Sequence, residues 1–402
     1  MSNSTATQGA SAAAQKAHAE IIEQCQRIYY DVRLEALAQW KKEDPSRTAV
    51  GFLPVYAPRE IFVGAGVRPV AVFGGGDQVN VIRGDSFYQS YICHLPRSVV
   101  ELGLTSWKSA LDGLVCPAIC DVIRNVSGVW QVLFKDKLTY FLDLPQNFDS
   151  AVGGKFYRRQ LEELAERLCQ MSRTKFDQDR FAEALRSYNR NRRAVRALCN
   201  LRVDKPHWVP AWEFYLLMRA GDQMDADGHS EILLKYMDVV SELDRAEQDN
   251  ARIMIVGGFC EQPPLNLIRT IERSGCYLVD DDFTLGARFL EADAAEDGDP
   301  LQALVDVYLR HSTYSSVKYE GDVPKSKQLV ETARDRRADG VLLMSPSFCD
   351  PSLLDRPHFQ RALEDAGIPY STLQYAENLG QFGPIREQTG TFAEAIKLWG
   401  EG

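Results

Sequence analysis

The sequence lacks several features that would place it in a common functional class. No apolar run approaches the roughly 18–20 residues that a membrane-spanning helix needs. No Gly-x-x-x-x-Gly-Lys-Ser/Thr motif occurs, which excludes a P-loop. The formal net charge is −10, which argues against general nucleic-acid binding. Residues 1–10 have no basic region followed by an apolar one, so we expect no signal peptide and a cytoplasmic protein.

Other catalytic signatures are missing as well. Gly64-Ala-Gly66 lacks the third glycine of a dinucleotide fingerprint and follows an expected helix instead of a strand. Only six histidines occur, and nothing suggests a Ser-His-Asp set. The nine cysteines are an odd number, and in a cytosolic chain they are not expected to form a disulfide framework. They are therefore either buried packing residues or ligands and nucleophiles.

What is present is a pattern that occurs twice in an ordinary globular composition. The 402 residues are 45% hydrophobic and 25% charged, enough for two or three domains. Asp112–Asp121 and Asp339–Asp350 both begin with Asp-Gly, run through apolar residues and a proline, and end in Cys-Asp. Such a run predicts a buried strand of a parallel sheet, with Cys-Asp in the loop at its carboxyl end. Open α/β sheets bind their ligands at this end.

The segments around the two copies repeat in the same order. A strand, a short helix and a strand are expected before each copy, and a further strand after it. The ranges are 49–55, 58–66, 70–74 and 138–144 for the first copy, and 253–257, 264–275, 276–280 and 368–375 for the second. The sequence therefore predicts an α/β protein with two similar parallel-sheet halves, Rossmann-like or flavodoxin-like.

The remaining segments are expected to be mostly helical. Residues 1–15 are expected to be a loose tail, and apolar residues at helical spacing over 16–41 predict one amphipathic helix. The acidic segment 291–300 is expected to be a solvated turn. The predicted organisation is an N-terminal tail and helix over 1–47, a first α/β domain over 48–150, a helical insert over 151–250 and a second α/β domain over 251–402.

Three cysteines differ in position from most of the others. Cys93, Cys120 and Cys349 are each expected in a loop beyond a strand or at the start of a helix. Three thiolates at one sheet edge can hold a soft metal centre with one open position, and an iron–sulfur cluster fits this better than a structural zinc ion with four protein ligands. The alternative is three unrelated loop cysteines. Cys116 ends an expected buried strand; Cys260 follows one and is a further, weaker ligand candidate.

Polar side chains near these cysteines are candidates for binding and catalysis. Arg97 and Arg124, with His94, can hold an acyl-CoA tail or donate hydrogen bonds to cluster sulfurs; each can also be an ordinary surface charge. The candidate proton donors are His94, Asp121 and Glu377.

Several short segments occur together in one known family. They are Tyr56-Ala-Pro-Arg-Glu60 with Gly64-Ala-Gly66, Cys93, Cys120-Asp121, Pro263-Pro-Leu-Asn266 with Asp280-Asp-Asp282 and Arg288, and Cys349-Asp350-Pro351. On these residues the chain resembles the catalytic components of 2-hydroxyacyl-CoA dehydratases (the D-component family) and of ATP-dependent, class I benzoyl-CoA reductases. The likeness extends over about residues 48–399. The closing run over 375–392 is similar to that of the reductase C (gamma) subunits.

The resemblance implies a cofactor and partners. The family's three cysteines bind one [4Fe–4S] cluster per chain, and by position they correspond to Cys93, Cys120 and Cys349. The implied partners are a homologous catalytic subunit, ATPase activator subunits with their own cluster, reduced ferredoxin as upstream donor and an acyl-CoA substrate. Neither nucleic acid nor a membrane is implied.

The resemblance also implies an activity. The chain is expected to be an oxidoreductase subunit in a hetero-oligomer that transfers low-potential electrons in anaerobic aromatic degradation. The reaction is reductive dearomatisation of benzoyl-CoA to a cyclohexadiene-carbonyl-CoA. Two alternatives stay open: a subunit of a 2-hydroxyacyl-CoA dehydratase, which is a lyase, and a non-catalytic subunit that only relays electrons.

Overall fold

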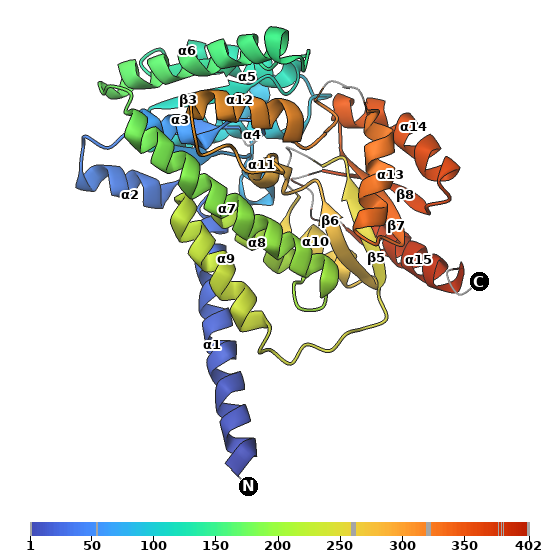
Figure 1. The fold of residues 1–402 in the computed structure, drawn as a ribbon. Helices are drawn as coiled ribbons and strands as arrows, with labels where there is room; N and C mark the ends of the chain where they lie inside the picture. The colour runs from blue at the N-terminus through green and yellow to red at the C-terminus, as the bar shows by residue number, and fades with distance from the viewer. Residues whose placement is uncertain are drawn as a thin grey trace.

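The computed structural model describes residues 2–53, 55–258, 263–318, 323–376, 378, 380 and 382–399. Two four-stranded sheets form its centre, and all paired strands within them run parallel. The strand orders are β2-β1-β3-β4 and β6-β5-β7-β8, which are the same order counted within each half. The prediction of two similar α/β halves is therefore confirmed (Figure 1).

The first half consists of strands that the apolar runs predicted. Its elements are β1 (Ala49–Phe52), α3 (Arg59–Gly64), β2 (Arg68–Ala71), α4 (His94–Leu102), β3 (Gly113–Pro117), α5 (Asp121–Leu133) and β4 (Leu138–Leu142). Every residue of the two inner strands, β1 and β3, is buried. Central strands of a parallel sheet are covered on both faces, which explains why they read as continuous apolar runs.

The second half repeats this plan. Its elements are β5 (Ala251–Val256), α10 (Leu265–Glu272), β6 (Cys276–Asp281), α11 (Leu285–Arg288), α12 (Pro300–His311), α13 (Lys325–Asp335), β7 (Gly340–Pro346), α14 (Asp350–Asp365), β8 (Tyr370–Tyr375) and α15 (Gly383–Trp399). All residues of β7 are buried, as they are in β3.

The acidic segment before α12 is mostly exposed and contains bends, as predicted, and polar contacts hold it in addition. Asp293 accepts hydrogen bonds from Arg193 and Arg196, each over 2.6 Å. Asp299 caps α12 by accepting from the amides of Leu301 and Gln302. The segment is therefore fixed by ion pairs to the preceding helical region and by its own helix cap.

The helical insert joins the two halves. It contains α6 (Lys155–Ser172), α7 (Gln178–Asp204), α8 (Ala211–Ala220) and α9 (Ala226–Val240), and the side chain of Asp177 caps α7. Near its middle, α7 contacts the first half through an ion pair of 2.7 Å between Arg192 and Glu60 of α3. At its end it contacts the second half, where buried Arg202 lies 2.5 Å from Asp281.

The N-terminal prediction was wrong in two respects. A helix begins at Ser2, where a loose tail was expected, and the single helix expected over 16–41 is two helices, α1 (Ser2–Tyr30) and α2 (Glu35–Glu43). Leu34 has a φ of 57°, in the left-handed region, which breaks the helical path. The Asp31 carboxylate accepts from the amides of Glu35 and Ala36 and so caps α2. The first turns of α1 project away from the body, whereas the rest packs on α8 and α9 (Figure 1).

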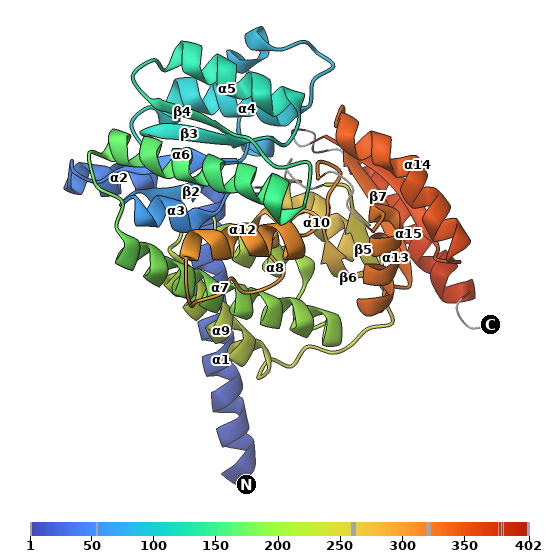
Figure 2. The same ribbon diagram turned by 45° about the horizontal axis from the view of Figure 1, so that its top comes forward.

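The two halves interlock at α12. This helix comes from the second half of the chain, yet its Tyr308 belongs to the apolar core of the first half, where its ring centroid lies 4.5 Å from that of Tyr157 in α6. Figure 2 shows α12 beside α6. No helix in the described ranges is both long and apolar enough to cross a membrane.

Candidate functional site

The three candidate cysteines occupy the same kind of place in the structure. Each stands directly before a helix: Cys93 before α4, Cys120 before α5 and Cys349 before α14. The first turn of a helix has unpaired N–H groups and the positive end of the helix dipole, and both stabilise a thiolate. The expectation that Cys93 stands at a helix entrance is thus confirmed.

Cys120 and Cys349 also hold equivalent positions in the two sheets. Cys120 follows β3 and Cys349 follows β7, and these strands have the same place in the two strand orders. In its sheet, β3 lies beside β1, and β7 lies beside β5, the first strand of each half. Between these two neighbours the order in which strands are added to the sheet changes direction. Ligands of open α/β sheets bind in the crevice beyond this point.

The loops that carry Cys120 and Cys349 approach each other although they belong to different sheets. Cys349 is only 7% exposed and belongs to the apolar core of the first half, against which Cys120 also packs. Burial raises the pKa of the Cys120 thiol, the amides of Ile123 and Val122 lower it, and the nearby charge of Asp350 raises it again, so the net pKa is raised. The N-terminus of α14 therefore reaches the surroundings of Cys120.

Cys93 is positioned by contacts from its own helix. Arg97 donates to the carbonyl of Ile92 over 2.8 Å and to Asp85 over 3.2 Å, which fixes the segment before Cys93. These bonds give Arg97 a structural task; its role as a substrate ligand stays a prediction. The neighbouring phenol of Tyr88 has a raised pKa because of burial, with smaller contributions from Cys116 and Cys93.

Sequence reasoning missed two further residues of α4 that hold this region. The Glu101 carboxylate accepts from three successive amides, those of Ile82, Arg83 and Gly84, over 2.6–2.9 Å. The Ser98 hydroxyl accepts from the amide of Gly75 over 2.6 Å. The available signal was the spacing: Ser98 and Glu101 lie three positions apart on a helix whose other residues are mostly apolar.

An open groove of about 620 Å³ contains three of the predicted residues. Cys120, Asp121 and Arg124 line it together, with the Arg124 guanidinium 4.9 Å from the centroid of Phe141. Nothing else in the described chain forms a hydrogen bond or ion pair with the Arg124 side chain, so its N–H groups can serve a ligand. The groove therefore brings together one predicted thiol, one predicted proton donor and one predicted binding residue.

A complete ligand set is not seen. Among the residues that the structure describes, no three of His, Cys, Asp and Glu are arranged to hold a metal ion. The donor chemistry nevertheless fits an iron–sulfur cluster, since three thiols stand at helix N-termini and Asp350, next to Cys349, lies near enough to Cys120 to influence its thiol. His94 is buried in the first turn of α4. Glu377 and Cys260 lie outside the described residues.

Tyr56 joins the two halves and was not singled out for a role. It lies in the loop after β1 with a φ of 62°, an unfavourable value for a bulky residue. Its buried hydroxyl lies 2.8 Å from the carbonyl of Thr313 and 2.8 Å from the hydroxyl of Ser315. A conformation of this kind persists only where surrounding contacts impose it, so the loop is strongly held.

Comparisons with known proteins identify relatives over most of the chain. The family model described as 2-hydroxyglutaryl-CoA dehydratase, D-component, matches residues 54–396. A benzoyl-CoA reductase subunit of Thauera aromatica, the one designated C, is 45% identical over 95% of this chain and 99% of its own length. The beta subunit of (R)-2-hydroxyglutaryl-CoA dehydratase from Acidaminococcus fermentans is 26% identical over 94% of this chain and 99% of its own length. The (R)-phenyllactyl-CoA dehydratase beta subunit of Clostridium sporogenes is 22% identical over 88% and 93%.

These matches confirm the resemblance found in the short segments. The family model covers the helical insert and, apart from β1, both sheets, and the likeness to the reductase subunit extends over nearly the whole chain. The chain belongs to the 2-hydroxyglutaryl-CoA dehydratase, D-component, family.

Proposed function

We propose that this chain is the iron–sulfur subunit of an ATP-dependent benzoyl-CoA reductase. The observation that carries the proposal is the 45% identity with the Thauera benzoyl-CoA reductase subunit over 95% of the chain. As an oxidoreductase subunit it takes part in the reduction of benzoyl-CoA to a cyclohexadiene-carbonyl-CoA, and it acts in the cytoplasm.

Cys93, Cys120 and Cys349 would hold one [4Fe–4S] cluster. The cluster supplies single-electron transfer at low potential, which dearomatisation requires. The protein's own contribution is electrostatic: the amides of Val122 and Ile123 face the Cys120 sulfur and stabilise negative charge there. Burial of Cys349 limits access of water to the same place.

The neighbouring polar residues receive roles that follow from their contacts. Arg124, with unused donors in the groove beside Cys120, is the better placed of the two arginines to bind the anionic part of an acyl-CoA. Arg97 acts mainly by fixing the segment before Cys93. His94, Asp121 and Glu377 are the proposed proton donors, and Asp121 shares the groove with Arg124.

The proposed assembly contains further subunits. A homologous subunit is expected because this chain matches both the beta and the alpha subunit of the Acidaminococcus dehydratase, the latter at 26% identity over 57% of the chain. ATPase activator subunits with their own cluster, supplied by reduced ferredoxin, complete the proposal. This chain contains no P-loop, and we assign it the role of electron recipient.

The likeness to dehydratase beta subunits supports a second candidate function, a subunit of a 2-hydroxyacyl-CoA dehydratase. The two functions differ in electron demand. A reductase consumes electrons in proportion to its product, whereas a dehydratase returns the electron after each turnover. Product formed per electron supplied, measured with the reconstituted complex, therefore separates them. A subunit that only relays electrons would leave all acyl-CoA contacts to its homologous partner.

A further inference from the structure

A cavity of about 390 Å³ lies between the helical insert and the second half of the chain. Its walls are one face of α7 and one face of α13, and its floor is made by residues near the carboxyl ends of β5 and β6. Cys93, Cys120 and Cys349 are not among the described residues that line it. Both the volume and the place at the sheet edge are typical of small-molecule sites in α/β proteins.

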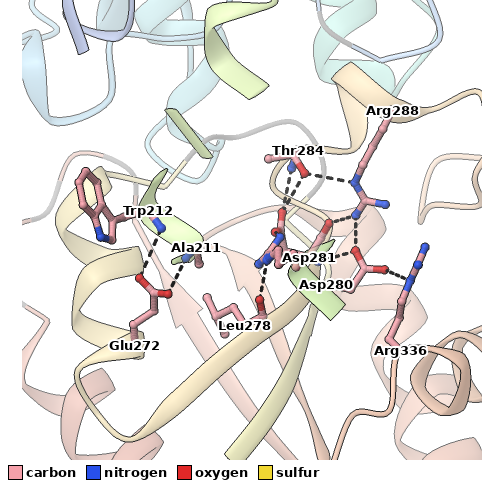
Figure 3. A network of polar contacts seen from close by, with 10 residues as sticks. Ala211, Trp212, Glu272, Leu278, Asp280, Asp281, Thr284, Arg288 and Arg336 are labelled. Atoms are coloured by element: carbon pink, nitrogen blue, oxygen red, sulfur yellow. Dashed lines mark hydrogen bonds and ion pairs between the residues drawn. The ribbon is translucent and has the colours of Figure 1, made fainter. Parts of the chain in front are cut away.

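Two arginines are fixed at this cavity by one carboxylate. Buried Asp280 accepts from Arg288 Nη2 over 2.7 Å and from Arg336 Nε over 3.0 Å (Figure 3). Burial raises the pKa of Asp280, but the two guanidinium groups outweigh this and lower it, so the carboxylate stays ionised. Within the described chain, no hydrogen bond uses Arg288 Nη1 or either Nη of Arg336. Asp280 therefore holds two cations in place while leaving donors for a ligand.

A third arginine enters from the opposite wall. Arg196 of α7 lines the cavity and donates from Nη2 to Asp293 over 2.6 Å. Its Nη1 is buried and has no hydrogen-bond partner in the part of the chain that is described. A buried donor without a partner costs free energy, and an acceptor on a bound ligand would remove this cost.

The remaining lining is neither purely basic nor purely polar. Glu291 and Asp335 line the cavity and would repel a ligand that is anionic throughout, but carboxylates accept hydrogen bonds from sugar hydroxyls. Leu329 and Phe359 are buried and add an apolar wall, against which a flat ring can pack. The lining thus combines anion donors, hydroxyl acceptors and apolar surface.

We propose that this cavity binds a nucleotide. Its phosphate contacts Arg288, Arg336 and Arg196, its ribose hydroxyls donate to Glu291 or Asp335, and its base packs against the apolar wall. The same chemistry can come from a free nucleotide such as ADP or from the adenosine phosphate end of coenzyme A. The proposal does not depend on the iron–sulfur cluster, because the cavity and the cysteine loops share no lining residue.

The test is isothermal titration of the purified full-length chain with ADP, coenzyme A, adenosine and inorganic phosphate. We expect ADP or coenzyme A to bind with a Kd below about 1 mM. Adenosine, which lacks the phosphate, and inorganic phosphate, which lacks the nucleoside, should each bind roughly tenfold more weakly or worse. Stronger binding of ADP than of coenzyme A assigns a free nucleotide, and the reverse assigns the coenzyme end of a thioester; both results support the site.

Variants connect the binding to the cavity. R336Q and R196Q should each weaken binding roughly tenfold, whereas R334Q, at an exposed residue in the last turn of α13 just before Arg336, should leave it unchanged. Arg196 is partly exposed, so its replacement keeps the test informative if loss of Arg336 disturbs folding. No binding of ADP or coenzyme A, equal binding of inorganic phosphate and ADP, or unchanged affinity in both R336Q and R196Q would overturn the proposal.

Discussion

Tyr56 donates its phenolic hydrogen to the carbonyl of Thr313 over 2.8 Å and so ties the loop after β1 to the segment after α12. The bond crosses from the first half of the chain to the second. The backbone of Tyr56 is strained, with a φ of 62°, and the hydroxyl contact is part of what holds it.

Replacing Tyr56 by phenylalanine tests this tie. Y56F keeps the buried ring but removes the hydroxyl from two oxygen partners, which should lower the free energy of unfolding by about 1–2 kcal/mol. Urea denaturation measures the change. Y91F, at an exposed tyrosine, is the control and should have no effect. Equal stability of Y56F and the unmodified chain would mean that the contact does not hold the halves together.

Glu101 should make the segment before Cys93 sensitive to acid. Although burial opposes it, three backbone amides lower the pKa of Glu101. A lowered pKa in the folded state gives stability that is present above the unfolded value, about 4.3, and is lost as the pH falls through the folded value. E101Q should therefore lower the free energy of unfolding by about 1–3 kcal/mol at neutral pH. Below pH 5 the stability of E101Q should depend less on pH than that of the unmodified chain. The measurement is limited proteolysis over residues 82–92, and E23Q, at an exposed residue, is the control. Identical cleavage of E101Q and E23Q would contradict the role of Glu101.

Gly84 and Gly128 should respond oppositely to alanine. A Cβ at Gly84 would lie 2.0 Å from the carbonyl oxygen of Arg97, so the segment must shift and lose its bonds to Glu101. At Gly128, inside α5, a Cβ meets nothing within 4 Å in the described structure. G128A should therefore raise stability by roughly 0.5–1 kcal/mol through helix propensity, and G84A should lower it. Thermal unfolding compares them; a stabilised G84A would contradict this view of the segment.

Lys318 should make stability rise with pH in the alkaline range. Burial lowers the pKa of Lys318 to about 8, with only weak compensation from Glu291. The unfolded chain binds this proton up to about pH 10.4, so between about 8 and 10.4 it binds more protons than the folded chain and folding gains stability. The gain should be about 1–3 kcal/mol between pH 7.5 and 9.5 and should be absent in K318M. K327M, at an exposed lysine, is the control and should still gain stability with rising pH. The same gain in K318M would exclude Lys318 as its source.

Much of the fold could be predicted because its signals are local. Continuous apolar runs between turn residues marked β1, β3, β5 and β7, since buried parallel strands need no polar face. Cys120 and Cys349 could be placed just beyond the carboxyl ends of strands by the same argument, whereas the helices that begin after them were not predicted. Leu34 could not be foreseen, because leucine rarely adopts a left-handed conformation and only its neighbours impose it here.

The rest of the site depends on contacts between distant segments. Burial of Cys349 in the core of the other half follows from how the two sheets face each other, which no local pattern encodes. The contacts of Glu101 with amides about twenty positions earlier, and the meeting of Arg288 with Arg336 at Asp280, are likewise tertiary.

The most direct test of the central claim is the iron and acid-labile sulfide content of the anaerobically purified chain, with Mössbauer spectroscopy. One [4Fe–4S] cluster is expected, lost when Cys93, Cys120 or Cys349 is replaced by alanine. C116A, a buried cysteine in the strand before Cys120, is the matched control and should retain the cluster. A chain without iron, or with the same iron content in all three variants as in C116A, would contradict the proposed iron–sulfur function.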